Sequence, residues 1–347
     1  MKKTFGLYKF VLTLFSFFLI LPVCSYAQTD FEVIETETGF YYTVKEGDTL
    51  WELSERFNDS PWLWPDVWSQ NQQIPNPHLI YPGQKIRLFL RQDLDGLARK
   101  ISSNSLSEKG SSDDLIYKEP IYYYYSPIES TGFLFKTPPA PAASIFKVKD
   151  DKELISTDDM VFIKHLNDHS FSPGKLYVTF EIISPVTHPE TDEKIGSHYL
   201  LTGVVEITRV EPDFSEAKVV KSYKNISVGN SLMPYTSRSP KIFITESRYG
   251  LYGNIVASEK LTRLSGDDTI VFIDKGNKDG VKPGQIYPVF KQDMVEIDRY
   301  NKEKVQLTPI VLGAIIVLHT EETTSTVLIS QAKQGIPLGA VFGIPIP

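Results

Sequence analysis

The stretch VFIDKGNKDGVKPGQIYPVF, residues 271–290, contains a glycine-rich loop of the kind that could hold a phosphate group. A phosphate loop after a strand must open a helix, because the backbone N–H groups at the helix N-terminus face the anion. In this chain Pro283-Gly284 leads instead into residues 285–290, which read as another strand. We therefore interpret the stretch as a turn between two strands and not as a nucleotide site.

The histidines offer a second chemistry, the binding of a metal ion. Of the six histidines, His165 and His169 have the i, i+4 spacing that would place two zinc ligands on one face of a helix. The sequence around them favours a strand and a turn rather than a helix. We therefore expect neither a metal nor any other cofactor.

Catalysis by a nucleophilic side chain finds little support. Cys24 is the only cysteine and lies in the N-terminal apolar segment, so cysteine peptidases and transpeptidases are excluded for a mature chain that lacks this segment. No G-x-S-x-G nucleophile elbow occurs. A lysozyme-type carboxylate pair stays open, but the long periodic helices of a helical lytic fold are missing. We predict that the chain is not an enzyme, with a cell-wall hydrolase as the alternative.

The first 27 residues have the pattern of a secretory signal peptide. Three lysines flank the start of an apolar run over residues 10–23, and residues 25–27 form a small-x-small cleavage pattern. As a helix the apolar run spans about 21 Å, less than the hydrocarbon core of roughly 30 Å. We expect export to the periplasm or cell wall and no membrane span after cleavage. An uncleaved anchor is the alternative.

The charge of the chain argues against nucleic acid as a partner. Loss of the three lysines of the signal segment changes the formal net charge from −7 to −10. No basic stripe offsets this acidity, and an acidic surface repels phosphate backbones. The 347 residues have an ordinary globular composition, with 41% hydrophobic and 23% charged residues, so we expect two or three folded domains.

The region after the signal predicts a small unit of strand, helix, helix and strand. A strand over residues 41–44 precedes a helix that Asp48 or Thr49 can cap. Pro65 suits the first turn of a second helix. Residues 85–88 close the unit as a second strand, after a Pro-Gly turn.

Two motifs of this unit, G-D-T-L at residues 47–50 and I-Y-P-G-Q at residues 80–84, resemble those of the LysM domain. The further residues that carry the resemblance are Tyr42, Val44, Leu53, Phe57, Asn71, Pro77 and Leu79. LysM modules bind glycans that contain N-acetylglucosamine, such as peptidoglycan and chitin. The resemblance implies a small α+β domain (βααβ) over residues 41–90 and peptidoglycan or a related glycan as the partner.

The resemblance also implies where the glycan lies, in a shallow groove between two loops. The implied glycan-binding residues are Gly47, Asp48, Thr49 and Leu50 in the first loop, and Ile74, Asn76, Pro77, Leu79 and Ile80 in the second. Backbone groups of both loops can meet the acetamido group, while Leu or Ile contacts its methyl. On the residues alone, Asp48 and Thr49 can equally serve as the helix cap.

All four tryptophans fall between residues 51 and 68, and residues 58–66 are longer and richer in tryptophan than the common LysM form. Trp62, Trp64 and Trp68 could stack on sugar rings. We expect at least two of them to pack against the linker or the sheet instead.

Residues 91–142 predict a linker with some ordered part, because they combine polar serine runs with a proline-rich stretch. Four consecutive tyrosines, Tyr122 to Tyr125, stand out in it. They could stack on sugar, but we favour a short half-buried strand that packs on a neighbouring domain.

From residue 143 onward the chain repeats itself at an offset of 110 residues. Val161-Phe162-Ile163 recurs as Val271-Phe272-Ile273, and Pro173-Gly174 recurs as Pro283-Gly284. Short β-branched runs separated by turn residues indicate β-structure in each copy. We predict two tandem, small, all-β domains over residues 143–235 and 253–347, with a closed barrel favoured over a sandwich.

The repeated motif resembles the carboxy-terminal barrel of flagellar assembly protein T and related envelope proteins. With the LysM-like unit and the signal, the arrangement looks like that of bacterial envelope LysM proteins. We predict a non-catalytic exported protein that binds peptidoglycan and presents its β-domains for scaffold or partner binding. An assembly factor of a trans-envelope complex is a further alternative.

Overall fold

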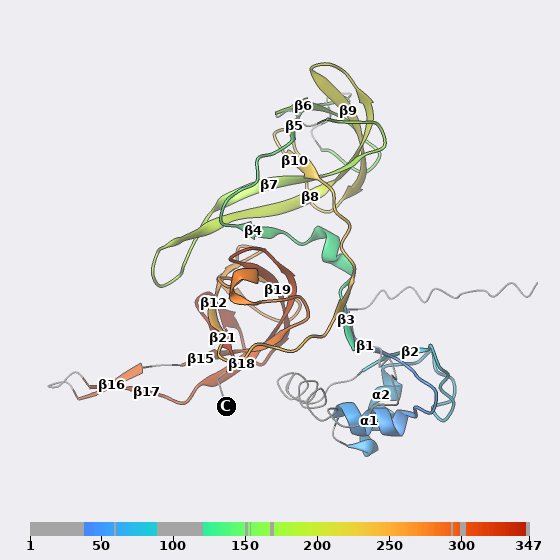
Figure 1. Cartoon of the computed structure of the whole chain (residues 1–347), viewed down its shortest axis with the longest axis vertical. Helices are drawn as coiled ribbons and strands as arrows, with labels where there is room; N and C mark the ends of the chain where they lie inside the picture. The colour runs from blue at the N-terminus through green and yellow to red at the C-terminus, as the bar shows by residue number, and fades with distance from the viewer. Residues whose placement is uncertain are drawn as a thin grey trace, which may run out of the picture. The chain divides into compact units, whose positions relative to one another are not determined.

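A computed structural model describes residues 38–58, 60–88, 121–149, 152, 154–166, 170–292, 294–298 and 303–344 (Figure 1). Every described residue belongs to one compact unit, within Glu35–Pro347. The predicted signal peptide and most of the predicted linker lie outside the described residues.

The N-terminal part has the predicted order of strand, helix, helix and strand. Its elements are β1 (Gly39–Thr43), α1 (Leu50–Asn58), a 3-10 helix (Pro61–Leu63), α2 (Trp64–Ser69) and β2 (Lys85–Arg87). β1 and β2 are antiparallel, with Tyr42 opposite Ile86. Leu53, Val67 and Ile86 are fully buried between the helices and the strands, because apolar residues recur at helical spacing on one side and at alternate positions on the other.

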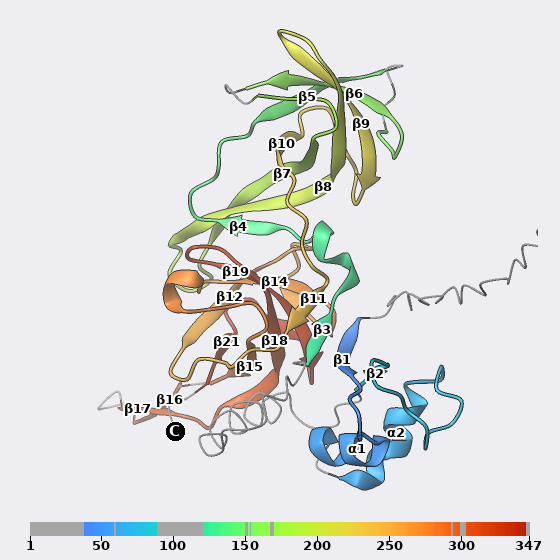
Figure 2. The same ribbon diagram turned by 45° about the vertical axis from the view of Figure 1, so that its right-hand side comes forward.

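The tyrosine run forms a strand of the same sheet. β3 (Tyr122–Tyr124) pairs with β1 on one side and with β11 (Lys241–Phe243) on the other, which gives the order β11-β3-β1-β2 (Figure 2). Tyr122 and Tyr123 are buried, and the ring of Tyr123 meets that of Phe40 edge-on at 4.8 Å between centroids. The prediction of a strand, rather than an exposed sugar-stacking run, is confirmed. A short 3-10 turn (Ser126–Ser130) and β4 (Phe133–Phe135) follow.

The C-terminal region is largely β and contains a closed six-stranded barrel. Around the barrel the strands are β12 (Tyr252–Ser258), β14 (Ile270–Ile273), β19 (Ser325–Ala332), β18 (Ile310–Thr320), β15 (Ile286–Lys291) and β21 (Val341–Gly343), which pairs back with β12. Figure 1 shows these strands, in orange to red, curling around a common centre. Their inward side chains, among them Val271, Tyr287 and Phe342, are fully buried. Two small ladders accompany the barrel: β13 (Leu264–Ser265) with β20 (Ile336–Pro337), and β16 (Met294–Asp298) with β17 (Glu303–Gln306).

A seven-stranded sheet precedes the barrel. It consists of β4, β5 (Ala143–Val148), β6 (Met160–His165), β7 (Leu176–Thr187), β8 (Lys194–Val210), β9 (Phe214–Ser222) and β10 (Ser231–Pro234). β8 pairs with β9 as well as with β7, so β5 to β10 also form a ring of pairings, and β4 is added to the outside of β8.

The strand pairs of this sheet recur in the barrel at the offset of 110 residues. Ile145 opposite Ile163 corresponds to Ile255 opposite Ile273, and the register shift that follows is at the same place in both. The long pairs β7–β8 and β15–β18 also match residue for residue. The closed barrel that we favoured is present in the C-terminal half. The division of residues 143–347 into two independent tandem domains stays a prediction.

Candidate functional site

The first loop of the predicted groove is held by two of its own polar side chains. Thr49 caps α1, since its hydroxyl accepts the N–H of Glu52 at 3.1 Å. The Asp48 carboxylate accepts the N–H of Lys45 and the hydroxyl of Tyr42, both at 2.8 Å. Gly47 adopts a left-handed φ of +88°, which closes the turn before the helix. The capping role that we considered is therefore present at Thr49.

The Tyr42 hydroxyl is a permanent donor to this loop. Burial raises the pKa of Tyr42 to about 12, and the hydrogen bond to Asp48 acts in the same direction. The Arg56 guanidinium lies 3.5 Å from the Asp48 carboxylate and 3.3 Å from the Tyr42 hydroxyl. Asp48 is thus engaged within the protein, so its carboxylate serves the shape of the loop.

The second loop is anchored by Asn71, whose side chain is fully buried. Its amide nitrogen donates to the carbonyls of Val67 (2.7 Å) and Arg87 (2.8 Å), and its oxygen accepts the N–H of Arg87 at 2.7 Å. Asn71 thereby joins α2 to β2, with the second loop between them. Further along, the Asn76 oxygen accepts the N–H of His78 at 3.0 Å, which makes a tight turn at the exposed rim.

The chain segments next to the two loops are joined at the end of the β1–β2 ladder. Val44 donates its N–H to the carbonyl of Gln84, and Gly83 donates to the carbonyl of Val44, each at 2.8 Å. Below them Leu50 and Ile74 belong to one buried core. The fold therefore brings together the two chain segments that the predicted groove requires.

The predicted site residues differ in what they offer a ligand. Gly47, Thr49, Asn76 and Leu79 are exposed, whereas Asp48, Pro77 and Ile80 are half-buried. The side chains of Leu50 and Ile74 are 2% and 1% exposed, so these two residues can present only backbone. Contact with an acetamido methyl falls to Leu79, which is 53% exposed, and to Ile80.

The tryptophans separate into two pairs. Trp64 and Trp68 are partly buried and pack against the core that the sheet residues share, as expected of two of the tryptophans, and the Trp68 indole donates to the carbonyl of Ile74 at 2.8 Å. Trp51 and Trp62 are 40% and 74% exposed, and their rings meet edge-on with centroids 4.8 Å apart. We did not predict this exposed aromatic pair. The sequence contained one indication of this exposure. Trp51 lies in the first turn of a helix that buries Leu50 and Leu53, so its own side chain lies on another face.

Comparison with known proteins agrees with this geometry. Residues 42–89 match the family model described as the LysM domain. These residues are a LysM domain. The chain is also 39% identical over 57 residues to the uncharacterized protein YqbP of Bacillus subtilis (strain 168), a match that covers 14% of this chain and 26% of that protein. The matched segment thus spans about a quarter of the length of this curated relative.

A LysM domain implies binding of peptidoglycan or related carbohydrate, and such domains are typical of extracellular and envelope proteins. Within the part of the chain that the structure describes, no three His, Cys, Asp or Glu side chains gather as they would around a metal ion. Among the same residues, no helix has the length and apolar character needed to span a bilayer.

Proposed function

We propose that this chain is an exported, non-catalytic envelope protein that binds peptidoglycan through its LysM domain. Its β-regions, residues 143–235 and 253–347, are proposed as two domains that present surfaces for scaffold or partner binding. The observation that carries the proposal is the LysM domain at residues 42–89, with hydrogen bonds that hold the two predicted groove loops and exposed residues in both.

The loops favour recognition of an N-acetyl sugar over other ligands. Their accessible surface includes backbone at Gly47 and Asn76 and apolar side chains at Leu79 and Ile80. An acetamido group needs this combination, because it offers one N–H, one carbonyl and one methyl group. A shallow exposed site of this size binds weakly on its own and benefits from the many repeats of a polymer.

The proposal is non-catalytic because Asp48, the one acidic residue among the predicted contacts, is engaged in hydrogen bonds within the protein. Asp48 accepts hydrogen bonds from the Tyr42 hydroxyl and the Lys45 N–H and lies 3.5 Å from the Arg56 guanidinium, so it acts as a structural acceptor. A glycosidase needs one carboxylic acid with a raised pKa opposite a second carboxylate. The groove loops supply Asp48 as their one acidic residue among the predicted contacts.

Sedimentation with purified sacculi tests the binding. Leu79→Asp should reduce the bound fraction by about tenfold or more, because it places a charge against the sugar. Leu154→Asp is the matched control, since Leu154 is 71% exposed but lies outside the LysM domain. Point variants test the loops more specifically than removal of residues 28–91. That removal would also take away β1, which pairs with β3.

Two results would contradict the proposal. Equal sedimentation of both variants would show that the LysM loops are not what binds the wall. Release of soluble glycan or peptide fragments from the sacculi would favour the hydrolase instead. Export is tested separately: we expect the mature chain to begin at Gln28, which mass spectrometry of its N-terminus would establish.

A further inference from the structure

The two repeats differ in the cover of one corresponding turn, which contains Gly174 in the first repeat and Gly284 in the barrel. Both glycines have left-handed backbone, with φ of +80° and +85°. A Cβ on Gly284 would lie 1.8 Å from the carbonyl oxygen of Phe243, because another chain segment crosses it there. A Cβ on Gly174 would meet no atom within 4 Å. The same turn is therefore covered in one repeat and open in the other.

In the barrel, the cover is the segment Thr245–Gly250, which enters from β11 and runs along the turn and the start of β15. Thr245 donates its N–H to the carbonyl of Gly284 at 3.1 Å. The Ser247 hydroxyl donates to the carbonyl of Ile286 at 2.6 Å and accepts its N–H at 3.0 Å. These contacts make the segment a substitute for a neighbouring strand at the edge of β15.

The end of the same segment is held by side chains of the barrel. Gln285 donates its amide to the carbonyl of Glu246 at 3.1 Å, and Arg248 donates its N–H to the hydroxyl of Tyr287 at 3.1 Å. The segment then leaves beside Ile344, whose carbonyl accepts the N–H of Gly250 at 2.7 Å.

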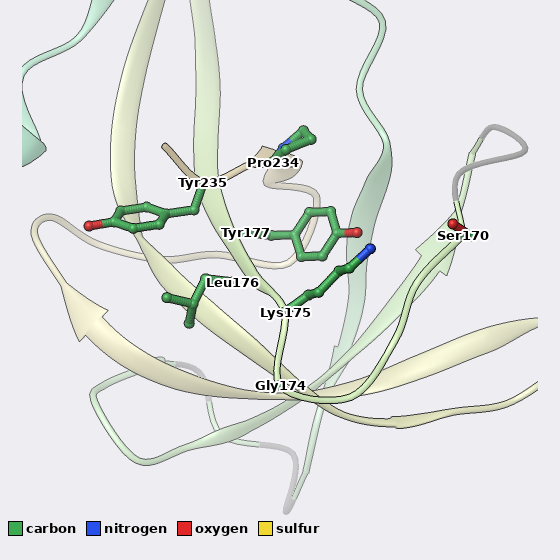
Figure 3. Close-up of a pocket in the computed structure, with 7 residues that line it drawn as sticks. All are labelled: Ser170, Gly174, Lys175, Leu176, Tyr177, Pro234 and Tyr235. Atoms are coloured by element: carbon green, nitrogen blue, oxygen red, sulfur yellow. The ribbon is translucent and has the colours of Figure 1, made fainter. Parts of the chain in front are cut away.

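In the first repeat the corresponding place is an open cavity of about 530 Å³. It is lined by Ser170, Gly174, Lys175, Leu176, Tyr177, Pro234 and Tyr235 (Figure 3). By the offset of 110 the covering segment corresponds to residues 135–140, which begin with Phe135, the last residue of β4, and Phe135 pairs with Ser197 of β8 instead. The turn at Gly174 is therefore left without the segment that covers its counterpart, while Pro234 and Tyr235 lie beside Tyr177 and Leu176.

Exposure of the lining residues follows the same difference. Leu176 is 37% exposed, whereas its counterpart Ile286 is fully buried. Lys175 is exposed, whereas its counterpart Gln285 is 4% exposed. An exposed leucine at the start of a strand, with a ready cavity beside it, is the surface expected of a binding site whose occupant comes from elsewhere.

We propose that this cavity binds an extended, acidic peptide segment of a partner protein, in the way that Thr245–Gly250 covers the barrel. The proposal rests on the partner-binding role of the β-domains and names its site and the class of partner. Leu176 supplies the apolar contact, and the carbonyl of Gly174 takes the place of that of Gly284 as a hydrogen-bond acceptor.

Charge selects the acidic character of the peptide. In the barrel, the neutral amide of Gln285 donates to the backbone carbonyl of Glu246. The first repeat has the ammonium of Lys175 at the position of Gln285. Figure 3 shows Lys175 and Tyr177 pointing to the same side of the cavity, toward Ser170. Among the described residues, no carboxylate lies within 4.0 Å of the Lys175 ammonium, so a peptide carboxylate can pair with it. One hydrogen-bond acceptor differs between the repeats. The carbonyl of Ile286 accepts the Ser247 hydroxyl of the covering segment, whereas the carbonyl of Leu176 already accepts the N–H of Tyr235 at 3.2 Å.

The test uses the full mature chain and a fluorescent peptide, ITESEYG, which is the barrel segment 244–250 with glutamate in place of Arg248. We expect saturable binding by fluorescence anisotropy and a loss of about tenfold or more in affinity for Leu176→Asp. Ile182→Asp is the matched control, because Ile182 is on the same strand, β7, and is 47% exposed. Its affinity should stay within about twofold of the unaltered chain.

A charge reversal separates specific pairing from apolar adhesion. Lys175→Glu should weaken ITESEYG and strengthen the lysine peptide ITKSKYG. No binding at about 1 mM peptide, or equal affinity for Leu176→Asp and Ile182→Asp, would overturn the proposal. A dimer of the chain that Leu176→Asp converts to a monomer in analytical ultracentrifugation would assign the cavity to a second copy, which also overturns it. Because no sacculi are present, either failure leaves the proposed glycan binding untouched.

Discussion

At the scale of single residues, the LysM domain shows how similar side chains divide between structure and recognition. Trp68 is packed and hydrogen-bonded to the carbonyl of Ile74, whereas Trp62 is 74% exposed beside Trp51. An indole with this much exposed surface contributes little to folding, so its presence is better explained by contact with a ligand.

We therefore predict opposite effects for two tryptophan substitutions. Trp62→Ala should leave the free energy of unfolding within about 0.5 kcal/mol but reduce retention on sacculi several-fold. Trp68→Ala should lower the free energy of unfolding by about 3–5 kcal/mol, because it removes a packed ring and leaves a carbonyl without its donor. Urea unfolding and sacculus sedimentation of both variants provide the measurements. Loss of stability in Trp62→Ala would contradict the assignment.

His198 is a second residue whose surroundings predict a measurable effect. It is fully buried on β8, its ring lies 4.8 Å from that of Phe272, and neither ring nitrogen has a hydrogen-bond partner within the described structure. Burial lowers the pKa of His198 to about 4, and the nearby charge of Lys224 adds to this.

The sign of the pH dependence follows from where the proton binds. Between about pH 6.5 and pH 4 the unfolded chain protonates His198 and the folded chain does not, so stability falls as the pH is lowered. The expected loss is about 3 kcal/mol over this range. His198→Leu should remove this part of the acid sensitivity, whereas His78→Gln, at an exposed site, should keep it. Urea unfolding at about pH 7 and about pH 4.5 measures the difference, and parallel acid profiles for all three chains would refute it.

At the scale of elements, the paired turns at Gly174 and Gly284 allow a backbone effect to be separated from a contact. Both glycines have nearly the same left-handed φ, so Gly→Ala costs about 1–2 kcal/mol of backbone strain at either position. Gly284→Ala also forces the added methyl against the carbonyl of Phe243, which should cost a further 1–3 kcal/mol, an order-of-magnitude range. Denaturant unfolding of the two variants checks this ordering. Equal losses would mean that the covering segment detaches from the barrel at little cost.

Much of the element structure could be predicted from local sequence. The strand that follows Pro283-Gly284, the cap at Thr49 and the tyrosine strand each have a short-range signal, such as alternation, a hydroxyl before a helix or a Pro-Gly turn. The motif around Asn71 pointed to the LysM domain, yet its bridge between Val67 and Arg87 depends on how α2 and β2 come together.

What could not be predicted depends on contacts between segments far apart in the chain. β3 pairs with β11, more than one hundred residues away, and no local pattern encodes that choice. The burial of Leu50 and Ile74 likewise follows from the core that they share, although the family pattern places both beside the groove. Residues 121–142, which we read as part of a linker, contain β3 and β4 because partner strands elsewhere accept them. The open cavity beside Leu176 emerges only when the two repeats are compared in three dimensions.

At the scale of the whole molecule, one LysM domain is joined to a β-region more than four times its length. A single shallow groove is expected to bind a short sugar weakly, so stable residence on the wall requires repeated rebinding along the polymer or a second attachment. The peptide site proposed beside Leu176 supplies a second attachment when the partner protein is itself bound to the wall.

We predict that joining two copies of the mature chain by a flexible linker will raise retention on sacculi by about 100-fold or more. Affinity for a soluble N-acetylglucosamine tetramer should stay unchanged, because each groove still meets one short ligand. Isothermal titration with the tetramer and sedimentation with sacculi measure the two quantities on the same preparation. A linked dimer in which one copy carries Leu79→Asp is the matched control, and it should fall back to the retention of a single chain. A second groove within reach of the same polymer must slow release from it. If linking does not raise retention on sacculi, the chain already acts as an oligomer on the wall or binds it through another surface.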